Sequence, residues 1–277
     1  GGYPQVGCRN VCCDRVRSNP QLTRFPVALG IRGLDGSFHL VEAGREMLRQ
    51  FELWTARGGF NGVVSSLSLT HAHLGHIDGL GLFGKEVMGL TDLTTHCSSS
   101  MCDLLRRTPA WADLLQQGVL TPQTWTQGKP FEPSPHCGFT ITPLPVPHRS
   151  ELSDTHALLI TGSRGTLLFI PDIDSWEELL LDRNMKDWLR DLNVDVALLD
   201  GTFWDGSELA NREMSEVPHP LVTSTMELLG PRAEGDPEVQ FIHLNHTNPL
   251  HNRDSLQFSK VAEQGWGVCG QGAIFSL

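Results

Sequence analysis

The feature that most constrains this chain is the histidine-rich run 70–76 (THAHLGH), which directly follows the apolar stretch 63–69. In an extended segment, residues two apart point to the same side, so His71 and His73 can bind one metal ion together. His76 follows at the expected start of a helix. Imidazole nitrogen suits zinc, iron or manganese, and a catalytic zinc site typically keeps an open position for water. The run therefore predicts an active-site metal.

Apolar stretches that end in turn or polar residues alternate with amphipathic segments along the chain. The expected strands are 38–41, 63–69, 166–170, 194–199 and 239–244. The expected helices are 45–54, 78–88, 98–117, 176–192 and 221–229. The segment 265–277 is expected to be a closing hairpin, and the proline-rich segment 130–147 a surface loop. This alternation predicts an α/β fold.

Polar side chains recur just after the expected strands. Ligands and catalytic groups of α/β sheets gather beyond strand ends, where loops aim side chains into a shared crevice. The residues at these ends are Glu42, His71, His73, Asp172, Asp200, His243 and His246. His148 is a natural third ligand for an ion held by His71 and His73, and Asp172 could bridge two ions. The alternative is that His148 and Asp172 are ordinary polar loop residues.

Composition narrows the class of protein. The 277 residues carry a formal net charge of −11 with only 21 Lys and Arg, which disfavours nucleic acid and favours a small-molecule substrate. No apolar run approaches the roughly 18 residues of a membrane-spanning helix. We expect one domain over residues 1–277 and a cytoplasmic protein, with a homodimer as one option. The chain opens on Gly1 rather than methionine, which leaves the native N-terminus open.

Three of the seven cysteines, Cys8, Cys12 and Cys13, crowd into six positions. An odd count in a chain of this size argues against a secreted disulfide framework. Soft thiolates at 8–13 could hold a structural zinc ion, with a fourth ligand from elsewhere, His251 or Cys137. Free buried thiols are the alternative.

The segment 70–79 resembles the metal-binding signature of the metallo-β-lactamase superfamily, His-x-His-x-Asp-His followed by Gly. Within it, the chain is similar to the family of pyrroloquinoline quinone biosynthesis protein B. The segments that carry this likeness are 1–5, 199–204, 212–214 and 242–249. The resemblance implies a metallo-β-lactamase αββα sandwich. It also implies a cysteine-rich zinc knuckle after the Gly-Gly-x-Pro-Gln turn, although this chain has Asn10 where a cysteine is usual.

One departure concerns the second metal. Gly75 stands where the superfamily places an aspartate that usually binds this ion. Either the site holds one zinc ion, or Asp78 or His246 compensates and His76 completes a second site with His243 or His246. Relatives of the quinone-biosynthesis type often lack the histidines that this chain has at 71, 73 and 76.

His219 follows the strand end at Asp200 by about the interval seen in phosphodiesterase branches of the superfamily. There, a histidine paired with an acidic residue helps to protonate the leaving group. A histidine beside an ionised carboxylate suits a general acid. The alternative is a loop histidine packed between Pro218 and Pro220.

The main hypothesis is hydrolysis of a small ester or phosphodiester by a metal-activated water, with one or two zinc ions, or with iron or manganese. His71, His73, His148 and Asp172 would hold the ion, and Asp200 with His219 would serve the leaving group. The resemblance implies a second hypothesis, iron-dependent oxidation in quinone cofactor biosynthesis. A non-catalytic carrier is the third.

Overall fold

The computed structural model describes residues 2–208 and 217–277. The chain divides into two compact units. Unit 1 comprises Gly1–Phe25, Val146–His148 and Arg164–Leu277, and unit 2 comprises Pro26–Pro145 and Arg149–Ser163. The family resemblance at 212–214 lies outside the described residues. The expectation of a single domain stays a prediction.

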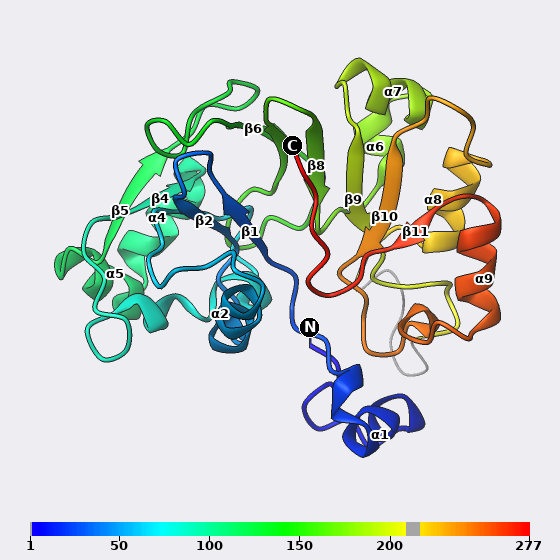
Figure 1. The fold of residues 1–277 in the computed structure, drawn as a ribbon, viewed down its shortest axis with the longest axis horizontal. Coiled ribbons are helices and arrows are strands. Elements are labelled where there is room, and N and C mark those ends of the chain that lie inside the picture. The colour runs from blue at the N-terminus through cyan, green and yellow to red at the C-terminus, as the bar shows by residue number, and fades with distance from the viewer. Residues whose placement is uncertain (1, 209–216) are drawn as a thin grey trace. The chain divides into compact units, whose positions relative to one another are not determined.

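Unit 2 is built on a five-stranded sheet in the order β1-β2-β3-β4-β5 (Figure 1). Its strands are β1 Leu29–Arg32, β2 Phe38–Val41, β3 Ser66–Ser68, β4 Leu93–Cys97 and β5 Leu120–Thr124. The β1–β2 pair is antiparallel and the other pairs are parallel, so β2 to β5 end at one carboxyl edge. The antiparallel pair β6 Thr140–Pro145 and β7 His156–Thr161 belongs to the same unit.

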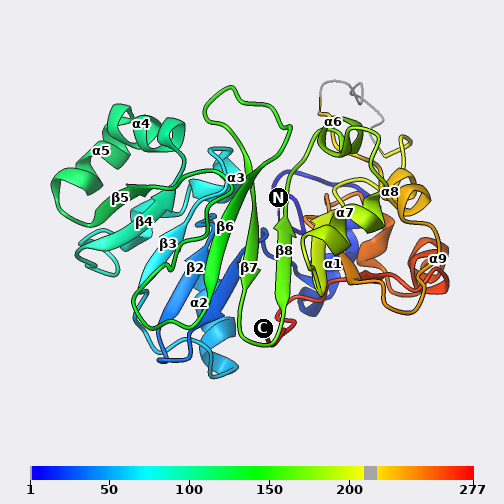
Figure 2. The same ribbon diagram turned by 90° about the horizontal axis from the view of Figure 1, so that it is seen from above.

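Helices pack on this sheet through an apolar core. They are α2 Met47–Ala56, α3 Leu74–Ile77, the 3₁₀ turn η2 Leu80–Phe83, α4 Ser99–Arg107 and α5 Pro109–Gln116. Figure 2 shows α4 and α5 beside β4 and β5. Fully buried members of the core include Leu40, Leu67, Phe83 and Met101. Their packing holds the strand ends at fixed positions.

Unit 1 contains four strands in the order β11-β10-β9-β8, all paired in parallel. Their bounds are β8 Thr166–Ile170, β9 Val196–Asp200, β10 Glu238–Ile242 and β11 Gly267–Val268. The helices are α1 Val11–Ser18, η1 Pro20–Leu22, α6 Trp176–Leu180, α7 Met185–Asp191, α8 Val222–Leu229, η4 Pro249–His251 and α9 Leu256–Glu263. Strand β8 is buried along its whole length, as a parallel strand covered on both faces should be.

The α/β class is as predicted, but several element predictions were wrong. The helix expected at 78–88 is only η2, because Gly79, Gly81 and Gly84 do not support a regular helix. The helix expected at 98–117 breaks before Pro109. The helix expected at 176–192 breaks at Leu181 and Asp182, which are both left-handed.

Predictions for two further segments differ from the strands observed. The segment 265–277 is no hairpin, because β11 pairs in parallel with β10. The segment 130–147 is not only a loop, since it contains β6. Among the described residues, none of the helices has both the length and the apolar character that crossing a bilayer requires.

Candidate metal centre and its neighbours

The histidine turn, residues 70–76, follows β3 at the carboxyl edge of the unit 2 sheet. His71 and His76 are buried, while His73 is half-buried and its Nε2 lies 3.3 Å from Oε2 of Glu151. The ring centroid of His71 lies 4.8 Å from that of His73 and 4.3 Å from that of His76. His73 and His76 therefore both pack against the ring of His71.

Glu42 backs this turn with a fully buried carboxylate. It directly follows β2 with a φ of 70°, an unusual value for a residue other than glycine. Its Oε1 accepts a hydrogen bond of 2.5 Å from the hydroxyl of Thr70, and its Oε2 lies 3.7 Å from Nδ1 of His76. The sequence placed Glu42 at a strand end but gave it no function.

The Thr70 hydroxyl also lies 2.9 Å from Nδ1 of His71. A hydroxyl has one proton to donate, and here Thr70 donates it in the hydrogen bond to the carboxylate of Glu42. Nδ1 of His71 must then donate to Oγ1 of Thr70, so the proton sits on Nδ1 and the lone pair on Nε2. We call this chain, Glu42–Thr70–His71, the first threonine relay. It prepares Nε2 of His71 to bind a cation.

Backbone hydrogen bonds connect the residue after Glu42 to the histidine turn and to Gly79. The amide of Ala43 donates to the carbonyl of His76 at 2.7 Å, and the amide of Gly79 donates to the carbonyl of Ala43 at 2.8 Å. A Cβ at Gly79 would lie 2.3 Å from the carbonyl oxygen of Gly44, so this approach requires glycine there. At Gly75, by contrast, a Cβ would meet nothing within 4 Å.

Neither residue expected to compensate for Gly75 lies free at the histidine turn. Asp78 pairs with Arg45 at 2.7 Å. His246 lies with the cysteines of unit 1, as described below. The acid that does lie with His71 and His76 is Glu42.

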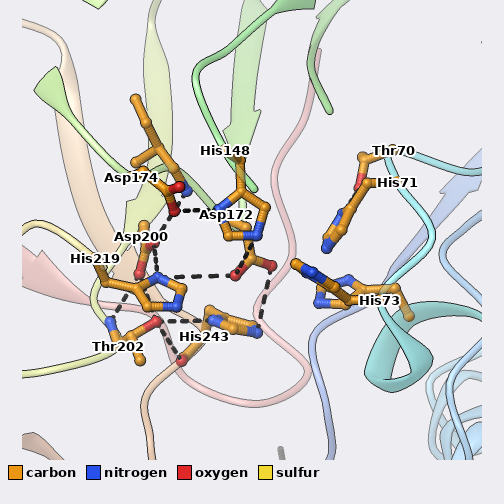
Figure 3. A network of polar contacts seen from close by, with 12 residues as sticks. Thr70, His71, His73, His148, Asp172, Asp174, Asp200, Thr202, His219 and His243 are labelled. Carbon is orange, nitrogen blue, oxygen red and sulfur yellow. Dashed lines mark hydrogen bonds and ion pairs between the residues drawn. The ribbon is translucent and has the colours of Figure 1, made fainter. Parts of the chain in front are cut away.

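Unit 1 gathers His148, Asp172, Asp200, His219 and His243 (Figure 3). Asp172 follows β8 and is buried. Its Oδ1 lies 3.9 Å from Nε2 of His148, and its Oδ2 lies 3.5 Å from Nε2 of His243. Nδ1 of His148 lies 2.6 Å from Oδ1 of Asp174, which fixes the ring and turns Nε2 toward Asp172.

A second threonine relay, Asp200–Thr202–His243, repeats the arrangement of the first. The Thr202 hydroxyl donates to Oδ1 of Asp200 at 2.6 Å and lies 2.9 Å from Nδ1 of His243. The same proton count places the His243 proton on Nδ1 and leaves Nε2 as the ligand nitrogen. His243, like Glu42, is left-handed, with a φ of 60°. The sequence predicted Asp200 and His243 but did not single out Thr202.

His219 pairs with Asp200 as the sequence predicted. Its Nδ1 lies 2.7 Å from Oδ2 of Asp200, and both side chains are buried. Asp200 also accepts from the amides of Thr202 and Ile173. These bonds fix the carboxylate of Asp200 so that its Oδ2 faces the imidazole of His219.

The cysteine cluster of unit 1 comprises Cys8, Cys12, Cys13 and His246. Sγ of Cys12 lies 3.9 Å from Sγ of Cys8 and 4.0 Å from Sγ of Cys13. Nδ1 of His246 lies 3.7 Å from Sγ of Cys12 and 3.5 Å from Sγ of Cys13. Tetrahedral zinc with bonds of 2.0 to 2.3 Å spaces its ligands by roughly 3.5 to 3.8 Å. The donor set therefore fits zinc.

The fourth residue of the cluster differs from both residues suggested by the sequence. His251 instead stacks on Tyr3, and its Nε2 lies 3.0 Å from the carbonyl of Asn245. Cys137 is in unit 2, where its thiol donates to the carbonyl of Phe139. His246 had been assigned to the active-site metal, but its ring faces the thiols.

The chain is similar to known proteins over most or all of its length. A family model described as "Beta-lactamase superfamily domain" matches residues 40–247. "Coenzyme PQQ synthesis protein B" of Xanthomonas axonopodis pv. citri (strain 306) is 24% identical, covering 100% of this chain and 96% of its own length. The protein of the same name from Methylobacterium radiotolerans is also 24% identical, with the same coverage.

Two solved structures show the same fold. One is Zn(2+)-bound PqqB from Methylobacterium extorquens, with a TM-score of 0.79, 19% identity, and coverage of 100% of this chain and 96% of that one. The other is a diphosphatase from the PhnP family, with a TM-score of 0.61, 18% identity, and coverage of 92% and 86%. The predicted metallo-β-lactamase fold is confirmed.

Proposed function

Because this chain belongs to the β-lactamase superfamily and each unit presents histidines oriented for a cation, we propose that it is a metal-dependent hydrolase of a small ester or phosphodiester. The observation that carries the proposal is the pair of threonine relays, which leave Nε2 of His71 and Nε2 of His243 as lone-pair donors. Hydrogen-bonded histidines with this tautomer are typical of catalytic metal sites.

In this proposal the metal ligands of unit 2 are His71, His73 and His76, and those of unit 1 are His148, Asp172 and His243. A divalent ion supplies a bound water whose pKa is lowered toward 7 and a positive charge for the developing oxyanion. Zinc is the first choice, since the similar protein from Methylobacterium extorquens is Zn(2+)-bound. The cysteine cluster holds a separate structural zinc ion.

The protein's own groups act on the leaving group. Asp200 accepts from Nδ1 of His219, which keeps that ring oriented and stabilises its charged form. Nε2 of His219 then donates its proton to the departing oxygen. The diphosphatase of the PhnP family, which shares this fold, supports phosphate chemistry as the substrate class.

The test is His73→Ala, with His136→Asn as the matched control. His136 is an exposed histidine with a φ of 68°, a backbone conformation that asparagine tolerates. Metal content and hydrolysis of bis(p-nitrophenyl) phosphate are measured on the purified proteins. His73→Ala is expected to lose both, and the control neither. A His73→Ala protein with full metal content and turnover would overturn the proposal.

A second candidate function rests on the relatives named for coenzyme PQQ synthesis, which match the whole chain. It is an iron-dependent oxidation of a small molecule in quinone cofactor biosynthesis. Iron in the purified protein, with turnover that requires oxygen, would favour it. Zinc or manganese, with turnover that does not depend on oxygen, would favour hydrolysis. A small-molecule substrate, a homodimer and a cytoplasmic location remain proposals under either function.

A further inference from the structure

A second group of polar side chains lies at the carboxyl edge of the unit 2 sheet, outside the candidate metal ligands. It consists of Trp125, Asp154 and His156. The amide of Trp125, just after β5, donates to the carbonyl of Cys97 at 3.1 Å. The amide of His156, at the start of β7, donates to the carbonyl of Thr70 at 3.1 Å. The group therefore lies where α/β sheets bind ligands, next to the histidine turn.

Two of these side chains have buried nitrogen atoms without a hydrogen-bond partner among the described residues. His156 is fully buried, and neither of its ring nitrogens forms a hydrogen bond with any described residue. Nε1 of Trp125 is buried and also lacks a hydrogen bond within the described part of the chain. The two ring centroids lie 5.3 Å apart at 69°. Buried polar atoms without a partner are rare in native proteins and indicate a bound group.

Asp154 supplies the charge. Its Oδ1 accepts hydrogen bonds from the hydroxyls of Ser98 and Ser100, and its amide donates to Oγ of Ser100 at 3.0 Å. These bonds hold the carboxylate at the start of α4. Its Oδ2 is left facing His156, 3.9 Å from Nε2. The Asp154 side chain is 41% exposed, so a small molecule can reach it from solvent.

No lysine or arginine of the described ranges pairs with Asp154, and His156 does not neutralise it either. Burial lowers the pKa of His156, so its ring is uncharged at neutral pH. An anion would be repelled by the carboxylate, whereas a cation would be attracted to it. A donor nitrogen can lie about 2.9 Å from both Oδ2 of Asp154 and Nε2 of His156, given their separation.

We propose that Asp154, His156 and Trp125 bind the protonated amino group of a small amine. The ammonium donates to Oδ2 of Asp154 and to one ring nitrogen of His156. Nε1 of Trp125 donates to an oxygen carried by the same molecule or by a water beside it. The amine is either a free ligand or part of the substrate at the histidine turn. The binding proposal does not depend on the hydrolase proposal.

The experiment follows the indole N–H signals of the seven tryptophans by ¹⁵N NMR. Trp125→Phe identifies the signal of Trp125. The probe is methylammonium chloride, with methanol and sodium acetate as the neutral and anionic comparisons at equal ionic strength. We expect a saturable shift of the Trp125 signal with methylammonium, and at least about tenfold weaker binding of methanol and acetate.

Asp154→Asn keeps the shape of the side chain and removes its charge. It is expected to weaken methylammonium binding at least about tenfold. Asp103→Asn, an exposed aspartate of α4 that pairs with Arg106, is the matched control and should change nothing. Unchanged positions of the other six indole signals verify that each variant is folded. Equal responses to all three probes, or full binding by Asp154→Asn, would overturn the proposal.

A kinetic arm distinguishes the source of the amine. An aminoethyl phosphodiester is compared with its ethyl counterpart. If the amine belongs to the substrate, Asp154→Asn raises KM for the aminoethyl compound alone and leaves kcat unchanged. If methylammonium binds but the two KM values respond equally, the amine is a free ligand. Because the NMR arm needs no turnover, failure of hydrolysis and failure of amine binding are separate results.

Discussion

The hydroxyl of Thr70 lies 2.5 Å from Oε1 of Glu42, and through this bond a buried acid sets the tautomer of His71. Asp200 acts on His243 through Thr202 in the same way. The two relays come from different units and different strands. In both, the acid is hydrogen-bonded to a threonine and the threonine to a histidine. This arrangement raises the basicity of the histidine as a metal ligand.

Thr70→Val removes the hydroxyl while keeping the shape of the side chain. His71 then loses the acceptor for its Nδ1 proton, and zinc affinity is expected to fall by about 10- to 100-fold. Thr121→Val, at an exposed position of the edge strand β5, is the control. Zinc titration against a competing chelator measures both. Equal affinity in the two variants would show that the first relay has no influence on the metal.

His219→Asn should affect substrates according to their leaving groups. Loss of a general acid slows the departure of an alkoxide by about 10²- to 10⁴-fold, whereas p-nitrophenolate leaves without a proton. The kcat for an alkyl phosphodiester is therefore expected to fall far more than the kcat for its p-nitrophenyl analogue. A uniform decrease for both would instead indicate that His219 acts on the metal or on folding.

Gly75→Asp tests the missing acid of the metal signature. A Cβ at this position meets nothing within 4 Å, so we expect a folded protein that retains the second metal ion more tightly in dialysis. Gly79→Asp is the contrasting variant, because its Cβ would lie 2.3 Å from the carbonyl oxygen of Gly44. It should lower the melting temperature. Metal content by elemental analysis and Tm by calorimetry check the pair.

Cys13→Ser should remove one zinc ion per chain, because it takes one thiolate from a four-ligand site. Cys269→Ser, which changes a cysteine outside the cluster, should keep the full metal count. Native mass spectrometry separates the two results by the mass of one ion. Equal zinc content in both variants would mean that the cluster holds free thiols.

Asp236 should make stability depend on pH. Burial alone would raise the pKa of this carboxyl, but hydrogen bonds from Lys186, the amide of Ala233 and Arg190 outweigh it and lower the pKa to about 2. The folded state therefore binds this proton less readily than the unfolded state. The stabilisation is complete above about pH 4, the usual aspartate value, and is lost as the pH falls toward 2.

Asp236→Asn is accordingly expected to reduce the free energy of unfolding by about 1 to 3 kcal/mol at pH 7. The difference from the natural chain should shrink between pH 4 and pH 2. Asp187→Asn, an exposed partner of the same Arg190, should have little effect at any pH. Urea unfolding across this range measures all three proteins. A difference that does not vary with pH would contradict the assignment.

The sequence was most informative for candidate site residues that directly follow a strand. Asp172, Asp200 and His243 were found this way, because a parallel strand delivers the next side chain to the carboxyl edge. Thr202 was not, since a threonine in a strand-end turn has no distinctive spacing. Thr202 donates its one proton to Asp200 and accepts from Nδ1 of His243, and only the geometry reveals this.

The partner of the cysteines could not be found from local spacing. His246 lies 234 positions from Cys12, and the adjacent pattern at 242–249 favoured the active-site metal instead. The helix expected at 78–88 failed for a different reason. Its apolar residues have helical spacing, but three glycines disfavour a regular helix, and one of them, Gly79, lies closely against Ala43 and Gly44.

The cysteine cluster also joins two segments that are far apart in the sequence. A zinc ion bound by both Cys12 and His246 would close a loop, because these residues are 234 positions apart in the sequence. It would link the start of the chain to the segment after β10. His243, the end of the second relay, lies in that segment. A cut after residue 13 would open this loop without removing any candidate catalytic residue. It would therefore test the contribution of the loop to the stability of the protein separately from the activity.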